Sequence, residues 1–372
     1  AWLMPGTMHA ACQPAGRRPP PSGRPNRITA VGRPLAHRSS DAPLAETAGI
    51  AIRALAIAVL AGTALACVLT LATGGSPPTL LVETVTGGWP AALWMASAWG
   101  WGRLAARGLG PVVRASRVLP PAIGAAILLG LDSAVLRLTA SPAAAWTLTL
   151  AGLAGLAALR LSRRTEPASA AAPAIPWPRS ALGLLLPGLL PAATLLAAAA
   201  AVPGWLWASE FGGYDALSYH LQLPAEWAEA GRARPLEHNV YSFLPNAVEH
   251  AFLHVGLLVG DPRTAGSTAH FLHAAMAVAA AATTASLARA TARAAGADEP
   301  SAGWIGAAAG VLLLATPWTV VCGSLAYCEM AVLWMMAASL RLALAADGEP
   351  RRGEAMREGL AHGLLCGAAV AA

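Results

Sequence analysis

The sequence predicts an all-α fold, a polytopic transmembrane helical bundle with a long external loop that bears short surface helices. Charged residues make up 12% of the chain and the mean hydropathy is +0.53, whereas soluble domains carry roughly 25% charged residues. Runs of about 20 apolar residues, the length that crosses a bilayer, recur along the chain. The net charge of +6 lies in a tail and in short loops, as membrane topology requires, so it does not indicate nucleic-acid binding.

The chain divides into three regions. Residues 1–47 are rich in Pro, Gly and Arg and cannot pack a core, so we expect a disordered cytoplasmic tail. Residues 48–180 form an N-terminal membrane region of about four spans. Residues 181–372 form a membrane core, expected to be truncated at its C-terminus because the sequence stops inside an apolar run. The predicted spans are 48–73, 88–105 (the weakest, whose Trp and Gly residues suit an interface), 119–138, 143–160, 181–203, 265–288, 303–321, 326–346 and a last one from 358.

Arginine placement predicts the orientation. Arginines cluster before or within the first span and after the second, fourth, sixth and eighth, so every second loop is basic and faces the cytoplasm. The N-terminus is then cytoplasmic, in a bacterial inner (plasma) membrane. The long loop 204–264 falls on the external, periplasmic side. Long loops in compact proteins usually carry function, so this loop is the first place to look for a site.

The polar stretch "EFGGYDALSYHL" opens the external loop. Asp215 precedes a predicted short helix, where a carboxylate commonly caps backbone N–H groups; a chemical role is compatible with that. A helix follows with Pro224 at its start and Gly231 just past its end, and a second surface helix begins near Asn246. On the second helix His250 and His254 lie one turn apart, a spacing that a metal pair can use. No third ligand is in register, so the sequence favours interfacial or hydrogen-bonded histidines over a metal site.

Two further acids interrupt apolar runs. Glu329 lies one turn into the eighth span at its external end, where it either serves a site or is a hydrated residue at the positive end of a helix. Asp132 lies inside the third span and raises the same alternatives. Arg137 follows five residues later, slightly off its helix face, which leaves a pair between the two open. The five scattered cysteines form neither a metal motif nor a disulfide framework.

Asp215 and Glu329 are both predicted on the external side, which suits chemistry at a membrane surface. A carboxylate can take the proton from an attacking hydroxyl or amine. A cation or hydrogen-bond donor can stabilise a leaving phosphate. The candidate donors are Arg232, Arg234, His220 and His238, although simple solvation also explains the two arginines.

The stretch "YDALSYHLQLPAEWAEAGRARPLEHNVYSFLPNAVE" resembles the first external loop of polytopic GT-C glycosyltransferases, most closely the bacterial branch of lipopolysaccharide-core and dolichyl-phosphate-mannose-type transferases. "SLAYCEMA" is similar to a later Tyr-x-acid motif of that family. The resemblance covers roughly residues 181–346. It implies Asp215 and Glu329 as catalytic residues. It also implies substrate-binding residues at the motif positions: Tyr214, Tyr219, His220, Arg232, Arg234, His238, Asn239, Tyr241, Glu249 and Tyr327.

The resemblance implies transfer of a sugar from a polyprenyl-phosphate donor to a lipid or glycan acceptor on the external face. It implies no definite cofactor and leaves a divalent metal ion open, because Ala216 follows Asp215 where many relatives have a second acid. Two alternatives stay open. A transporter or flippase would use polar residues near the midplane, of which Asp132 is one. A non-enzymatic membrane assembly protein would use the external loop as a binding surface.

Overall fold

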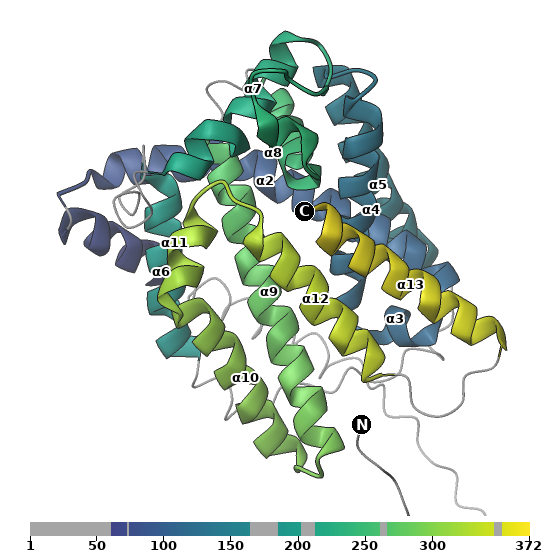
Figure 1. The fold of residues 1–372 in the computed structure, drawn as a ribbon. Helices are drawn as coiled ribbons and strands as arrows, with labels where there is room; N and C mark the ends of the chain where they lie inside the picture. Colours follow the sequence, from purple (N-terminus) through teal and green to yellow (C-terminus); the bar gives the residue numbers. More distant parts are fainter. Residues whose placement is uncertain (1–60, 73, 164–184, 202–212, 261–265, 346–351) are drawn as a thin grey trace, which may run out of the picture. The chain divides into compact units, whose positions relative to one another are not determined.

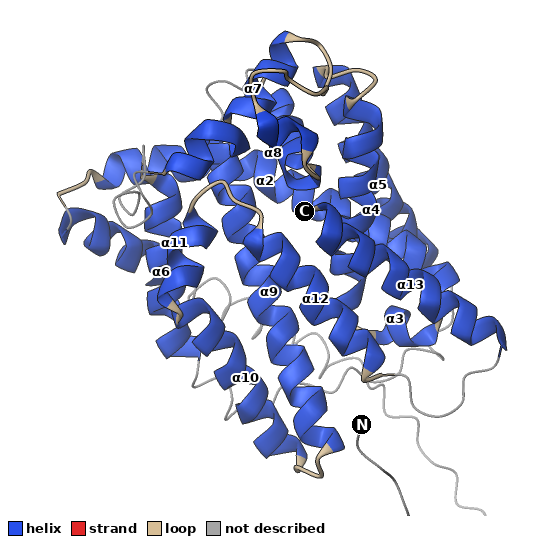
Figure 2. Cartoon of the chain, in the orientation of Figure 1, coloured by secondary structure: helices blue, strands red, loops and turns tan. Residues whose placement is uncertain are grey.

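The described part of the chain is built from helices (Figure 1). The computed structural model describes residues 61–72, 74–163, 185–201, 213–260, 266–345 and 352–372. Within these ranges no β-strand occurs, which confirms the all-α prediction (Figure 2). The predicted tail 1–47 lies outside the described residues. The helices are α2 (Pro77–Leu109), α3 (Pro111–Ala115), α4 (Leu119–Leu136), α5 (Pro142–Arg163), α6 (Leu185–Ala200), the π-helix η3 (Ala216–His220), α7 (Gln222–Glu229), the 3₁₀-helix η4 (Val240–Phe243), α8 (Ala247–Val259), α9 (Gly266–Ala294), α10 (Glu299–Ala315), α11 (Pro317–Ser324), α12 (Glu329–Ala343) and α13 (Arg352–Ala371).

Fewer helices than predicted are long and apolar enough to cross a bilayer. Among the described residues α4 and α9 meet that requirement. The pair α10–α11, bent by 61° at Thr316, is a third if both helices count as one broken span. Within the described residues, other predicted spans contain shorter apolar helices, among them Ala61–Ala72 and Pro187–Ala200. Length and composition therefore support membrane helices without establishing all nine predicted spans.

The predicted weak span 88–105 is part of a single helix of 33 residues, α2, which packs against α4, α5 and α9. Its glycines make the close contacts. A Cβ added to Gly102 would lie 2.5 Å from the carbonyl carbon of Pro120 on α4. One added to Gly100 would lie 2.6 Å from the carbonyl carbon of Gly152 on α5. Residues two apart on a helix point to nearly opposite faces, so the two glycines let α2 approach one helix on each side.

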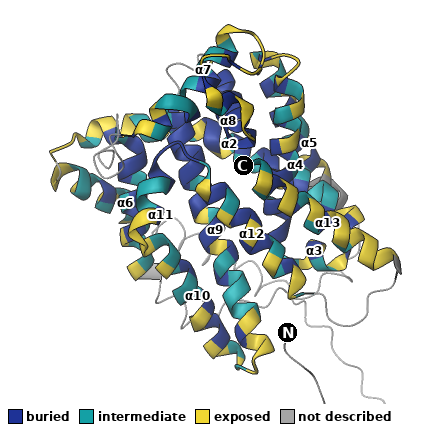
Figure 3. Ribbon diagram, viewed as in Figure 1, coloured by how far each residue is buried: buried dark blue, intermediate teal, exposed yellow. Residues whose placement is uncertain are grey.

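The prediction of a second surface helix is wrong. Every residue of α8 from Ala247 to Leu258 is buried, and the helix packs against α2, α4, α5, α7 and α9 (Figure 3). The physical reason is that α8 is apolar on nearly all sides, which is typical of a buried helix. Its polar residues, Glu249, His250 and His254, each have a hydrogen-bond partner inside the protein.

The first helix of the external loop, α7, has one buried face formed by Leu223, Pro224 and Trp227. It begins two residues before Pro224 and ends as predicted, because Gly231 follows the C-cap with a positive φ of 69°. The chain then pairs with the turn between α4 and α5. Ala233 N donates to Leu136 O at 2.8 Å, and Ala140 N donates to Gly231 O at 2.7 Å.

Candidate functional site

Asp215 lies where the external loop turns into η3. Gly213, with a φ of 70°, makes the turn before it. Asp215 itself has helical dihedral angles (φ −66°, ψ −42°), and its side chain accepts no cap hydrogen bond. The predicted N-cap contact is therefore wrong, because a residue with helical φ and ψ lies inside the turn rather than at its flank. The carboxylate is half-buried and has no hydrogen bond to any described residue.

The segment after Asp215 packs against the segment before Glu329. Ala216, Leu325 and Tyr327 form a small buried apolar cluster. The rings of His220 and Tyr327 have centroids 5.2 Å apart. Glu329 is exposed at the first position of α12. Tertiary packing thus brings Asp215 and Glu329, which are 114 positions apart in the sequence (329 − 215), to one end of the helices.

Three carboxylates raise the pKa values of two side chains in these segments, Tyr219 and Cys328. Partial burial raises the pKa of the Tyr219 phenol, and nearby negative groups raise it further. Burial also raises the pKa of the Cys328 thiol, to about 12, with added contributions from the same acids. The carboxylates that affect both pKa values are those of Asp215, Glu249 and Glu329. Both groups are therefore neutral at physiological pH, inside a region of negative charge.

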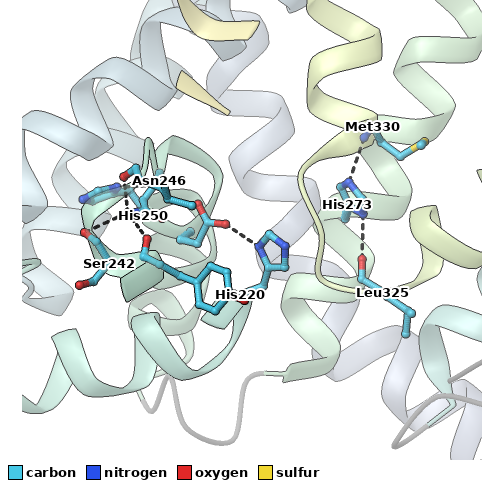
Figure 4. Close-up of polar contacts among 10 residues, drawn as sticks. His220, Ser242, Asn246, His250, His273, Leu325 and Met330 are labelled. Atoms are coloured by element: carbon cyan, nitrogen blue, oxygen red, sulfur yellow. Dashed lines mark hydrogen bonds and ion pairs between the residues drawn. The ribbon is translucent and has the colours of Figure 1, made fainter. Parts of the chain in front are cut away.

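His220 is bound to Glu249 of α8. His220 Nδ1 lies 2.5 Å from Glu249 Oε1, and the side chains are 3% and 2% exposed (Figure 4). A carboxylate oxygen at Nδ1 fixes the proton on that nitrogen and leaves Nε2 as the atom that can meet a ligand. Glu249 Oε2 is buried and has no hydrogen bond from a described residue. Glu249, predicted as a substrate-binding residue, thus acts on the site through His220.

Tyrosines line the other side of His220. The rings of Tyr219 and Tyr241 stack with centroids 4.2 Å apart, and Tyr219 also contacts the ring of His220 at 4.0 Å. Asn239 ties η4 to η3, since its Nδ2 donates to Ser218 O at 3.0 Å and its Oδ1 accepts from Tyr241 N at 3.1 Å. Asn239 therefore holds the loop in shape. Tyr214 is 59% exposed beside Asp215.

Three predicted phosphate-binding residues lie away from this cluster. Arg232 and Arg234 are exposed on the segment that pairs with the α4–α5 turn. No contact among the described residues joins either guanidinium to Asp215 or Glu329. His238 pairs with Glu226 of α7 at 2.9 Å, and its side chain is 62% exposed. Of the four candidate donors, the structure brings His220 alone into contact with the residues around the acids.

A second polar cluster lies among the apolar helices. Asp132 of α4 accepts a hydrogen bond from Trp94 Nε1 at 3.0 Å and binds His254 Nδ1 at 2.6 Å. His254 Nε2 lies 2.8 Å from Thr149 Oγ1. All four side chains are fully buried. Asp132 therefore pairs with His254 of α8 and not with Arg137, which is exposed.

The proposed metal pair is not formed. His254 is bound to Asp132 and Thr149, while His250 Nδ1 bonds the Asn246 carbonyl oxygen and its ring stacks on Trp227 at 4.9 Å. Within the described residues no group of three or more His, Cys, Asp or Glu side chains could hold a metal ion.

Sequence reasoning missed His273 of α9, a fully buried residue that contacts the segment before Glu329. One histidine in an apolar run gives no signal by itself, because its partners are about 50 residues away. Comparisons with known proteins add nothing to these contacts: the chain matches no protein-family model, no curated protein and no solved structure.

Proposed function

We propose that the chain is a membrane glycosyltransferase that moves a sugar from a polyprenyl-phosphate carrier to an acceptor on the external face. One observation carries this proposal. Asp215, Glu249 and Glu329 converge on the same small group of side chains at the end of apolar helices. A carboxylate such as that of Asp215, which no described residue hydrogen-bonds, is suited to act as a general base near a lipid-linked donor.

In the proposed reaction the carboxylate of Asp215 takes the proton from the acceptor hydroxyl. The acceptor oxygen forms a bond to the anomeric carbon of the sugar. The bond from that carbon to the phosphate oxygen breaks, and its electron pair leaves with the polyprenyl phosphate. Attack from the face opposite the phosphate inverts the anomeric carbon. In this scheme His220 Nε2 accepts a hydrogen bond from a substrate hydroxyl, while Glu329 orients the acceptor.

Asp215→Asn is expected to lower the rate of sugar transfer about 10²- to 10⁴-fold, because the amide cannot accept the proton. The measurement follows radiolabel from a mixed pool of polyprenyl-phosphate sugars in membranes that contain the chain. Asp298→Asn is the matched control. Asp298 is an exposed N-cap of α10, and Asn caps helices as well as Asp does. Equal transfer by the Asp215 variant and the unaltered chain would remove the assignment and favour a binding or assembly role.

The proposed orientation has its own test. Val240, 71% exposed on η4, belongs to the loop predicted outside, and Met356, 74% exposed on α13, follows an Arg-rich loop predicted inside. We expect Val240→Cys to react with a membrane-impermeant thiol reagent in intact cells and Met356→Cys to react only after lysis. Ser242→Cys is the accessibility control, since Ser242 is 7% exposed and its hydroxyl donates to Asn239 O at 2.7 Å. The reverse labelling pattern would invert the topology.

The transporter alternative depends on Asp132. A transport site would present polar groups that a passing substrate can engage. Asp132 is instead bonded by Trp94 and His254, which is the arrangement of a structural network. This observation supports the glycosyltransferase proposal over transport through the α2–α4–α8 contact.

A further inference from the structure

His273 joins two helix ends through one imidazole ring. Its Nδ1 lies 2.8 Å from Leu325 O and 2.9 Å from Cys322 O, at the C-terminal end of α11. Its Nε2 accepts a hydrogen bond of 3.1 Å from Met330 N, in the first turn of α12 (Figure 4). Helix ends leave carbonyl groups and N–H groups without partners inside the helix. The N-cap residue of α12, Cys328, makes no side-chain cap hydrogen bond, so α9 supplies that cap from outside.

These partners fix the protonation of the ring. Carbonyl oxygens only accept, so Nδ1 must carry a hydrogen atom. A backbone N–H only donates, so Nε2 must be bare. His273 is therefore the neutral Nδ1–H tautomer. An imidazolium ring would place two donors face to face at Met330.

We propose that His273 is a positioning residue for the candidate site: its ring clamps residues 322–330 and thereby presents Tyr327, Cys328 and Glu329 to the loop that carries Asp215. The assignment of Glu329 to catalysis rests on the proposed function, but the clamp itself does not. Two contacts connect residues 322–330 with the segment that follows Asp215. Leu325, whose carbonyl the ring binds, packs on Ala216, and Tyr327 packs on His220.

Cys328 is a built-in reporter of this clamp. It lies between Tyr327 and Glu329, two residues before Met330, whose N–H group His273 binds, and it is half-buried. Burial first, and then the neighbouring acids, raise the pKa of its thiol to about 12. Thiolates react with alkylating reagents and thiols do not, so the thiol is slow to react while the segment is held.

The test measures the rate of iodoacetamide labelling at Cys328, resolved by mass spectrometry, in the full chain in lipid nanodiscs. His273→Leu removes all three hydrogen bonds and is expected to speed labelling about tenfold, because the segment opens more often. His273→Asn keeps a donor near Nδ1 and His273→Gln keeps an acceptor near Nε2, so each is expected to give an intermediate rate. These two variants also carry the test if the Leu variant does not fold.

His270→Leu is the matched control. His270 lies one turn earlier on α9, is 3% exposed, and interacts with the backbone of Ala199 on α6. We expect this change to leave the Cys328 rate unaltered. An unchanged rate in all three His273 variants, or an equal increase in the His270 variant, would overturn the clamp.

The labelling is read without sugar transfer, so it separates the two proposals. Faster labelling in a chain that transfers no sugar would keep the clamp and remove the glycosyltransferase. Where the unaltered chain does transfer sugar, His273→Asn is expected to lower kcat more than it raises KM. This variant loses the bond to Met330 N beside Glu329 and keeps a donor for Leu325 O, which packs on the loop at Asp215. A fall in kcat matched by an equal rise in KM, without faster labelling of Cys328, would contradict the role of His273 as a positioning residue.

Discussion

Gly124→Ala is expected to destabilise the chain by about 3 kcal/mol, at the upper end of the range for overpacking. Gly124 lies where α4 crosses α2. An added Cβ would overlap the carbonyl oxygen of Ala98 and lie 2.7 Å from its carbonyl carbon. These are backbone atoms, so no side chain can rotate away and the two helices must separate. Small residues at helix crossings are what allow backbones in membrane proteins to approach closely.

Gly130→Ala, on the same helix, is the matched control. No atom lies within 4 Å of a Cβ at Gly130. There the substitution is expected to be neutral or to stabilise by up to about 1 kcal/mol, since Ala favours a helix over Gly. The measurement is unfolding of the purified chain in detergent, followed by far-UV circular dichroism. Equal unfolding midpoints for the two variants would show that α2 and α4 pack less closely than in the structure.

The run 88–105 shows what composition can and cannot predict. Its Trp and Gly residues made it the weakest predicted span, suited to an interface. In the structure its glycines are contact points, Trp94 reaches Asp132, and Trp101 Nε1 donates to Leu148 O at 3.3 Å. The sequence predicts that a helix is here. Whether a glycine weakens a helix or admits a neighbour depends on the neighbour, which lies elsewhere in the chain.

In the candidate site, too, some features were predictable from the sequence and others were not. Local features were predictable: the helix that ends at Gly231, the acid after a glycine turn, and the acid at the start of an apolar helix. Pairings were not. Glu249 was predicted to bind substrate from a surface helix, yet it lies on a buried helix and binds His220, 29 positions away (249 − 220). Such contacts follow from tertiary packing, for which a single sequence carries no direct signal.

Asp132→Ala is the second large expected effect, a loss of about 3–5 kcal/mol, which is typical when one partner of a buried pair is removed. The change would leave Trp94 Nε1 and His254 Nδ1 without an acceptor in a fully buried place. Unfolding in detergent, as for Gly124, measures it. Asp132→Asn keeps the shape of the side chain and one acceptor oxygen, so its loss of unfolding free energy is expected to be clearly smaller than that of Asp132→Ala. Equal stability of the Ala variant and the unaltered chain would contradict the network.

The double variant Asp132→Leu, His254→Leu tests whether the buried pair matters for the stability of the fold or for the position of α8. Replacing both partners of a buried pair by apolar residues is often neutral, whereas each single change leaves a charge or donor unpaired. We expect the double variant to be more stable than either single Leu variant. His254 and Glu249 share α8, five positions apart (254 − 249). If the double variant folds but sugar transfer falls, then the pair between Asp132 and His254 matters chiefly because it sets where α8 holds Glu249 against His220.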